Sequence, residues 1–237
     1  MMAFRLFDRP SPNFDARPDG AVVDMLVLHY TGMKSAEEAL ARLCDPEAKV
    51  SAHYTIDRDG RTYAHVPEEG RAWHAGVSFW AGERNINGCS IGIELVNPGH
   101  EFGYEPFPET QIAALIDLAG EITRRHRIAP ARVLGHSDVA PARKEDPGEL
   151  FPWPQLADFG IGIWPFAPHA RGPVPENKED AFVRGLRQFG YGFSPDADVP
   201  LEKAVAAFQR HWRPAKVDGV IDEESAYRLG VLLDALS

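Results

Sequence analysis

Residue types that bind metals or move protons gather in one short segment of the chain. Residues 135–148 read GHSDVAPARKEDPG, so His136, Lys144 and Asp146 lie on an irregular stretch rich in proline and glycine. A zinc ion that keeps a position open for water takes three protein ligands, commonly imidazole nitrogens and carboxylate oxygens. His136 and Asp146 therefore need one further imidazole to complete such a site.

His29 is the expected third ligand. It ends the apolar run of residues 22–29, whose length and β-branched content predict a central strand that delivers its last side chain to the rim of a sheet. Singly, a histidine after a buried strand is usually a satisfied polar group, and a loop histidine or aspartate is usually solvated. Together, His29, His136 and Asp146 predict a site for one zinc ion per chain.

Two further residues are candidates for proton transfer and charge stabilisation. Glu94 lies in the apolar run of residues 90–96, where a charge is costly unless it is paired or functional. The alternative, a carboxylate on a solvent-facing strand, is disfavoured because the neighbouring residues show little polar alternation. We predict that Glu94 is a general base and that Lys144 directs its ammonium group at an oxyanion; the alternative for Lys144 is a surface salt bridge.

The elements expected to position these residues alternate between strands and helices. Ser35 begins a capping-box pattern that predicts a short helix, and helical spacing of apolar residues predicts a long one before His126. The fold class expected is α/β, with a mixed central β-sheet flanked by helices and followed by a small C-terminal three-helix bundle. The predicted strands are residues 22–29, 54–56, 61–63, 90–96 and 133–135, and the predicted helices are residues 36–43 and 108–126.

The composition divides the chain into two units. Residues 167–179 are too rich in proline and glycine to continue a regular element, which predicts a linker between residues 1–166 and residues 180–237. Apolar residues at helical spacing predict three short helices in the second unit. Every residue with predicted chemistry lies before the linker, in the first unit.

Charge and hydropathy narrow the class of protein. The net charge of −10 argues against a nucleic-acid partner, and no stretch of about 18 apolar residues predicts a membrane span. The N-terminal residues lack the apolar core of a signal peptide, which predicts a cytoplasmic protein, with a periplasmic one as the alternative. We also expect a monomer in which Cys44 and Cys89 are free thiols rather than a disulfide.

Five ordered segments resemble the type 2 N-acetylmuramoyl-L-alanine amidases. These are zinc enzymes that cut between the lactyl group of muramic acid and the first alanine of the peptidoglycan stem. Residues 151–165 resemble the longer branch of that family, and pieces of residues 186–222 resemble a peptidoglycan-binding domain. The five segments are LHYT at 28–31, SAHY at 51–54, RAWHAG at 71–76, SIGIELVN at 90–97 and residues 136–148.

The resemblance implies substrate contacts outside the metal site. His74 is expected either to donate to a substrate oxygen or to pack its loop, and Trp73 and Asn87 are expected to bind substrate. Arg84 is the nearest residue to an arginine that binds a diaminopimelate carboxylate in relatives, although Asn85 occupies the matching place. His53 follows Ala52 where some relatives have a tyrosine, which implies a structural role for His53.

The predicted function is therefore that of a zinc-dependent hydrolase of peptidoglycan fragments. The expected substrates are 1,6-anhydro-muropeptides released during cell wall turnover and recycled in the cytoplasm. One alternative is an enzyme that acts on intact wall murein, which the expected wall-binding module favours. Another is a non-catalytic peptidoglycan recognition protein, which the complete set of His29, His136 and Asp146 disfavours. An inert structural protein leaves Glu94 and Lys144 unexplained.

Overall fold

The computed structural model describes residues 5–166, 177–193 and 199–236. Its main sheet has six strands in the order β1-β5-β4-β7-β3-β8, and a separate antiparallel pair is formed by β2 and β6. The pair β4 and β5 is antiparallel, whereas the other neighbours in the main sheet are parallel, so the sheet is mixed as predicted. The strands are β1 Leu6–Asp8, β2 Phe14–Ala16, β3 Met25–Tyr30, β4 Tyr54–Ile56, β5 Thr62–Ala64, β6 Gly70–Ala72, β7 Ser90–Leu95 and β8 Val133–Gly135.

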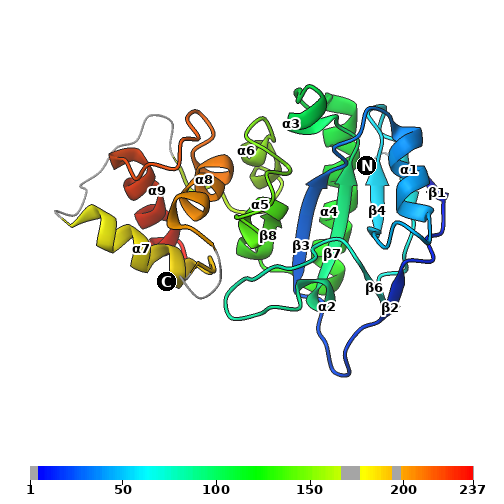
Figure 1. The fold of residues 1–237 in the computed structure, drawn as a ribbon, viewed down its shortest axis with the longest axis horizontal. Coiled ribbons are helices and arrows are strands. Elements are labelled where there is room, and N and C mark those ends of the chain that lie inside the picture. Colours follow the sequence, from blue (N-terminus) through cyan, green and yellow to red (C-terminus); the bar gives the residue numbers. More distant parts are fainter. Residues whose placement is uncertain (1–4, 167–176, 194–198, 237) are drawn as a thin grey trace.

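The helices of the described residues cover the sheet and form a group of their own at the C-terminal end (Figure 1). In the figure α4 lies behind the sheet, and α7, α8 and α9 lie together beyond α5 and α6. The helices are α1 Ala36–Cys44, α2 Ile86–Cys89, α3 Gly99–Phe102, α4 Glu109–His126, α5 His136–Val139, α6 Trp153–Ala157, α7 Lys178–Phe189, α8 Leu201–Trp212 and α9 Glu223–Asp234, with a 3-10 turn at Pro130–Arg132. None of these helices is long and apolar enough to cross a membrane.

Most predicted elements are confirmed, with small shifts at their ends. The Ser35 side chain accepts a hydrogen bond from the backbone N–H of Glu38 and so caps α1, as the capping-box pattern predicts. The first central strand begins at Met25 rather than at Val22, which is exposed, because its pairing with β7 starts at Ser90. Both cysteines are free, as expected: Cys44 ends α1 and Cys89 ends α2.

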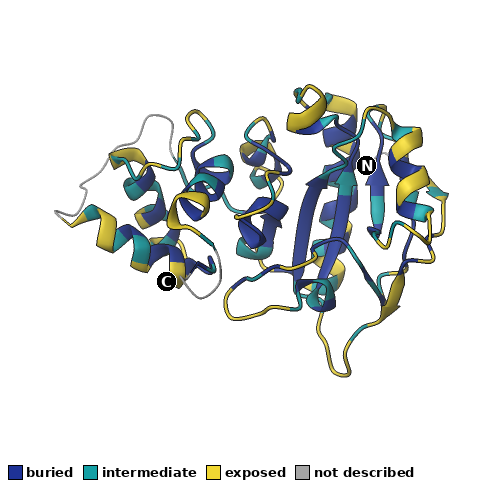
Figure 2. Cartoon of the chain, viewed as in Figure 1, coloured by how far each residue is buried: buried dark blue, intermediate teal, exposed yellow. Residues whose placement is uncertain are grey.

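The two faces of the central strand β7 carry different kinds of side chain. On β7, Ile91, Ile93 and Leu95 pack with the apolar face of α4, while Ser90, Gly92 and Glu94 alternate with them and point to the other face. Ser90 and Gly92 are buried as well, so the face of β7 that carries Glu94 does not face solvent. Figure 2 shows both central strands, β3 and β7, as almost wholly buried.

One apolar core joins the sheet to the C-terminal helices, and another packs the sheet against α4. The first includes Met25 and Val27 of β3, Val139 of α5, and Phe189 and Trp212 of α7 and α8. Helix α7 begins at Lys178, inside the predicted linker of residues 167–179, and residues 167–176 lie outside the described residues. The three-helix group is confirmed, while the division into residues 1–166 and 180–237 stays a prediction.

Candidate metal centre and active site

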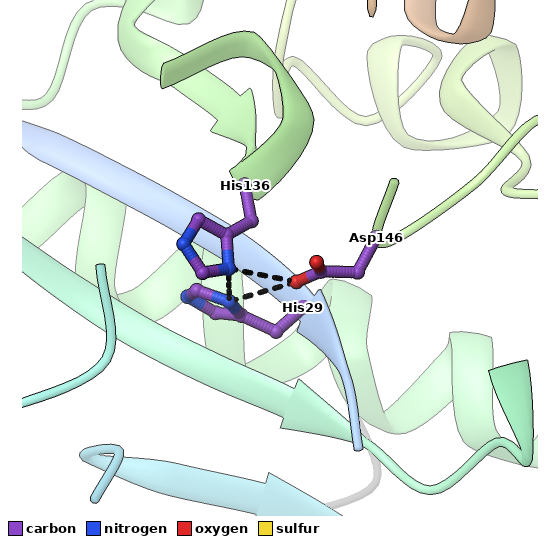
Figure 3. Close-up of side chains that lie close together, drawn as sticks. All are labelled: His29, His136 and Asp146. Atoms are coloured by element: carbon purple, nitrogen blue, oxygen red, sulfur yellow. Dashed lines mark hydrogen bonds and ion pairs between the residues drawn. The ribbon is translucent and has the colours of Figure 1, made fainter. Parts of the chain in front are cut away.

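Three buried side chains meet at one end of the central strands. The Nδ1 atoms of His29 and His136 lie 2.9 Å apart, and the Oδ2 atom of Asp146 lies 3.0 Å from each (Figure 3). In this arrangement one potential ligand atom from each residue lies within 4.8 Å of the others. The structure thus brings together the three residues that the sequence predicts as ligands.

The order of the strands explains how distant residues meet. Strands β3 and β8 are parallel neighbours, with Leu28 opposite Gly135, so His29 and His136 each follow at the same edge of the sheet. His136 is the first residue of α5, and the backbone N–H of Ser137 donates to the carbonyl of Asp146 at 2.9 Å. That bond folds the segment of residues 136–146 back on itself and carries Asp146 to the histidines.

The Nε2 atoms of His29 and His136, which point away from the cluster, each have a hydrogen-bond partner that fixes which ring nitrogen carries the proton. His136 Nε2 lies 3.0 Å from the carbonyl oxygen of Ala75, and because a carbonyl only accepts, Nε2 carries the proton. A neutral imidazole protonated at Nε2 leaves Nδ1 as an acceptor. The Nδ1 atom of His136 therefore faces the cluster with a free lone pair.

A chain of hydrogen bonds fixes His29 in the same way. The Ser90 hydroxyl donates to the carbonyl of Ile86 at 2.5 Å, so its oxygen accepts from His74 Nε2 at 3.2 Å. With its proton on Nε2, His74 accepts at Nδ1 from His29 Nε2, 3.0 Å away. His29 Nδ1 is then an acceptor as well.

Three acceptors with no proton between them now face one another at hydrogen-bond distance. Burial lowers the pKa of His29 to about 4, and burial also holds the pKa of His74 well below its usual range, so both rings are neutral at pH 7. Two imidazole nitrogens and a carboxylate oxygen form the donor set of catalytic zinc sites, so the residues fit zinc.

Gly92 makes room for the ring of His74. A Cβ atom at this position would lie 2.5 Å from the His74 ring, closer than side chains tolerate. The absence of a side chain lets His74 pack against β7 and reach both His29 and Ser90. His74 thus contacts a candidate ligand and a strand, while its two predicted roles, to donate to a substrate oxygen or to pack its loop, stay predictions.

A cavity of about 540 Å³ opens over the cluster. Trp73, His74, Glu94 and Lys144 all line it, next to the three candidate ligands. It also reaches the exposed Arg42 and the apolar residues Met33 and Leu43 at its α1 side. The structure therefore brings Trp73, His74, Glu94 and Lys144 together with the three candidate ligands in one cavity, and their roles stay predictions.

Glu94 stands beside His29 with one carboxylate oxygen unpaired. His29 and Glu94 are opposite each other in the register of β3 and β7, so both side chains leave the same face of the sheet. Glu94 Oε2 is buried and has no hydrogen-bond partner among the described residues. Burial and the nearby Asp146 charge raise the pKa of Glu94 well above its usual range, against the opposing effect of Lys144. Such a carboxyl is suited to exchanging protons with a bound water or substrate.

Lys144 is half-buried at the wall of the cavity. Among the described residues no carboxylate lies within 4.0 Å of its ammonium nitrogen, so the alternative of a surface salt bridge is not seen there. Its charge acts instead on the site, since it lowers the pKa values of both Glu94 and His29. The ammonium group is therefore available to a negative charge that develops in the cavity.

Two other predicted residues lie away from this cavity. The Asn87 carboxamide oxygen accepts from the backbone N–H groups of His74 and Ala75, at 3.2 and 2.8 Å, and so holds their loop. Arg84 lies over the Phe79 ring and lines a second cavity beside the C-terminal helices. Neither Asn87 nor Arg84 lines the cavity over the ligands. The structure therefore does not place their side chains where they would contact a substrate bound in that cavity.

His53 and Arg143 complete the surroundings of the site. His53 is buried and accepts at Nδ1 from the backbone N–H of Gly92 at 2.9 Å, which is consistent with a structural role. The sequence reasoning missed Arg143, whose guanidinium donates to the carbonyls of Val77 and Ala75. The sequence offers one signal for Arg143, which is that this second cationic residue directly precedes Lys144.

Comparisons with known proteins agree with this geometry. A family model described as N-acetylmuramoyl-L-alanine amidase matches residues 19–149. The chain is 39% identical over 232 residues to the N-acetylmuramoyl-L-alanine amidase AmiD of Escherichia coli, a match that covers 90% of this chain and 83% of that protein. It is 34% identical over 161 residues to the 1,6-anhydro-N-acetylmuramyl-L-alanine amidase AmpD of Haemophilus influenzae, covering 60% of this chain and 85% of AmpD.

Solved structures give the same result. The complex of Escherichia coli AmiD with anhydro-N-acetylmuramic acid-L-Ala-D-gamma-Glu-L-Lys matches with a TM-score of 0.80 and 37% identity, covering 92% of each chain. AmpDh3 of Pseudomonas aeruginosa also matches with a TM-score of 0.80, at 35% identity, over 92% of this chain and 94% of that one. On its sequence, its fold and its cluster of His29, His136 and Asp146, the chain belongs to the type 2 N-acetylmuramoyl-L-alanine amidase family.

Proposed function

We propose that this protein is a zinc-dependent N-acetylmuramoyl-L-alanine amidase that acts on peptidoglycan fragments, with 1,6-anhydro-muropeptides as its substrates in recycling. The observation that carries the proposal is the convergence of three acceptor atoms on one point of a cavity that also holds Glu94 and Lys144. The names of the AmpD relatives and the ligand bound to AmiD support the substrate class.

The metal would be held by three atoms of this chain. These are Nδ1 of His29, Nδ1 of His136 and a carboxylate oxygen of Asp146, with one ion per chain. A zinc ion in such a site lowers the pKa of water towards about 7 and polarises a carbonyl group. His74 and Ala75 would keep both ligand rings in the tautomer that offers Nδ1.

Glu94 would move the protons of the reaction. Its carboxylate takes a proton from the attacking water and returns it to the nitrogen of L-alanine as the lactyl amide bond breaks. The raised pKa of Glu94 supports this exchange, because a carboxyl with a pKa closer to neutrality both accepts and releases a proton readily. Its register opposite His29 holds it next to the ligands.

Lys144 would stabilise the oxyanion that forms when the carbonyl carbon becomes tetrahedral. Its ammonium group needs no rearrangement for this, because it lies in the cavity without a carboxylate within 4.0 Å among the described side chains. Trp73 offers a flat, half-buried surface at the cavity wall for the sugar or the stem peptide, and its indole N–H is held by Asp15 at 3.2 Å. We leave Asn87 and Arg84 out of the proposed substrate contacts.

Mass spectrometry of the reaction products tests the proposal and its alternatives. With a purified anhydro-muropeptide, the expected products are anhydro-N-acetylmuramic acid or its disaccharide and a stem peptide with a free L-alanine amino group. Release of the same peptides from intact sacculi at a higher rate would favour the wall hydrolase. Binding of the fragment without any cleavage, by protein loaded with zinc, would favour a recognition protein and contradict the proposal.

The remaining expectations concern the assembly and the place of action. We propose a monomer, which light scattering of the purified protein tests, and action in the cytoplasm, which cell fractionation tests against a periplasmic location. We also propose that residues 180–237 bind polymeric peptidoglycan, on their resemblance to a known binding domain. Sedimentation of the full chain with sacculi, with an unrelated acidic protein as control, tests this last point.

A further inference from the structure

The C-terminal helices contact residues 136–146, the segment that carries the candidate ligands His136 and Asp146, at a buried carboxylate. Asp138 of α5 is wholly buried and lies two residues after the candidate ligand His136. Its Oδ1 atom accepts a short hydrogen bond from the hydroxyl of Tyr191, and its Oδ2 atom accepts from His211 Nδ1 at 2.6 Å. Tyr191 follows α7 and His211 belongs to α8, so both donors come from the C-terminal helices.

The same carboxylate holds the start of α5. Its Oδ2 atom also accepts from the backbone N–H of Gly135 at 2.8 Å, which satisfies a donor at the helix N-terminus. The helix begins with His136, and the N–H of Ser137 donates to the carbonyl of Asp146. Two of the three candidate ligands are therefore attached to the short helix that Asp138 holds.

The donors themselves are fixed by aromatic packing. The His211 ring stacks between the rings of Trp153 and Trp212, with centroids 3.6 Å from each. Tyr191 packs against the Trp80 ring at 4.9 Å. Buried rings in such contacts have little freedom to turn, so the hydrogen-bond donors are held in place before any ligand binds.

A second contact lies at the other end of the segment. Arg210 of α8 donates to the carboxylate of Glu145 at 2.8 Å, and Glu145 immediately precedes Asp146. Helix α8 therefore contacts the segment of residues 136–146 near both of its ligands. This pair is partly exposed, so it contributes less to stability than the buried contacts of Asp138.

We propose that Tyr191 and His211 are positioning residues of the metal centre, which act through Asp138 to hold His136 and Asp146 in their binding geometry. The proposal rests on the proposed zinc site and adds that the C-terminal helices are part of it. It differs from the expectation of an independent module joined by a linker. Groups that hydrogen-bond directly to a metal ligand typically change metal affinity by about 10 to 100-fold when they are lost. Tyr191 and His211 act one contact further away, through Asp138, so we expect the lower end of that range.

Two conservative variants of the full chain test the proposal. Tyr191→Phe removes only the hydroxyl, and His211→Phe removes the donor but keeps an aromatic ring between the two indoles. We expect each to weaken zinc binding by about tenfold, measured by competition with a chromophoric chelator. We also expect the visible absorption bands of the Co²⁺-substituted protein to change, because they report the geometry of the ligands.

Matched controls separate positioning from general loosening of the interface. Leu229→Ala weakens the packing of α9 against Gly185 of α7, and Tyr227→Phe removes a hydroxyl from α9 of the same group of helices. We expect Leu229→Ala to lower the melting temperature, and both controls to keep the wild-type zinc affinity and Co²⁺ spectrum.

The outcomes distinguish this proposal from the zinc site itself. If wild-type protein binds no zinc, the proposed function fails first. If the wild type binds zinc and Tyr191→Phe and His211→Phe lower only the melting temperature, with unchanged zinc affinity and Co²⁺ spectrum, the contacts merely hold the two parts together. That result would overturn the positioning role.

Discussion

His29 and Glu94 are register partners on the neighbouring parallel strands β3 and β7. Because partners across a ladder point to the same face, a candidate metal ligand and the candidate base leave the sheet side by side. Their separation is set by the backbone hydrogen bonds of two central strands, which are the most buried part of the sheet. Rigid strands thus fix the geometry on which proton transfer depends.

Replacing Glu94 with Gln should abolish turnover but spare the metal. The amide keeps the shape of the side chain but cannot accept a proton, and general acid-base help is worth about 100 to 10,000-fold in rate. The checks are kcat on an anhydro-muropeptide and zinc content by elemental analysis. Glu101→Gln makes the same change at an exposed position of the same cavity and should leave kcat nearly unchanged. Zinc loss in Glu94→Gln would make Glu94 structural instead.

Replacing Asp146 with Ala should remove metal and activity together. The variant loses one of three ligand atoms and leaves the nitrogens of His29 and His136 facing each other without the carboxylate between them. Equilibrium dialysis against zinc should show much weaker binding, and kcat should fall with the bound metal. Full zinc occupancy in this variant would show that the ion lies elsewhere.

Replacing Ser90 with Ala should weaken zinc binding from a distance. The Ser90 hydroxyl fixes the proton of His74, which in turn fixes that of His29, so its loss allows the wrong tautomer at a ligand. In Ser90→Ala the affinity for zinc should fall by up to about tenfold. In His74→Gln, which removes the direct partner of His29, it should fall by about 10 to 100-fold. Chelator competition measures both.

Ser11→Ala is the matched control for Ser90→Ala. The Ser11 hydroxyl is buried and also donates to a backbone carbonyl at 2.5 Å, but its partner is Leu43, on α1. This variant should lose a similar amount of stability and keep the zinc affinity of the wild type. Equal zinc affinities in the Ser11 and Ser90 variants would contradict the relay.

Glu68 should make stability depend on acid pH. Burial raises the pKa of its carboxyl, but hydrogen bonds from Arg125, His126 and Tyr54 outweigh burial and lower that pKa from 4.5 to about 2. A lowered pKa in the folded state means that the stabilisation is present above about pH 4.5 and is lost as the pH falls towards 2. The free energy of unfolding attributable to Glu68 should fall by about 1 to 3 kcal/mol over that range.

The check is urea unfolding of the wild type and Glu68→Gln between pH 6 and pH 2. The variant should be less stable near neutrality and show a flatter pH dependence, so that the two curves approach each other at low pH. Glu69→Gln changes the exposed neighbouring carboxyl and should follow the wild type. A constant difference between the wild type and Glu68→Gln at every pH would contradict the linkage.

The sequence predicts most of the candidate metal site because its residues follow regular elements. His29 comes at the end of an apolar strand and His136 directly after another, and parallel neighbours bring such ends together. Asp146 and Lys144 lie close enough to His136 along the chain to share its location. Glu94 is identifiable because a carboxylate stands among isoleucines and leucine.

Other features depend on contacts that no local pattern encodes. The role of Gly92 follows from the approach of His74, which comes from a separate loop. Asn87 looks like a substrate contact in sequence, yet it turns towards the backbone of that same loop. The contact between Asp138 and the C-terminal helices joins residues 53 and 73 positions apart, so a linker-based division of the chain cannot reveal it.

A zinc titration of metal-free protein tests the central claim most directly. Protein stripped with a chelator is given increasing zinc, and the hydrolysis of an anhydro-muropeptide is measured in the same samples as bound zinc. Activity should be absent without metal, rise in proportion to bound zinc and stop rising at one zinc per chain. Full activity in the stripped protein, or no activity at one bound zinc per chain, would contradict the account.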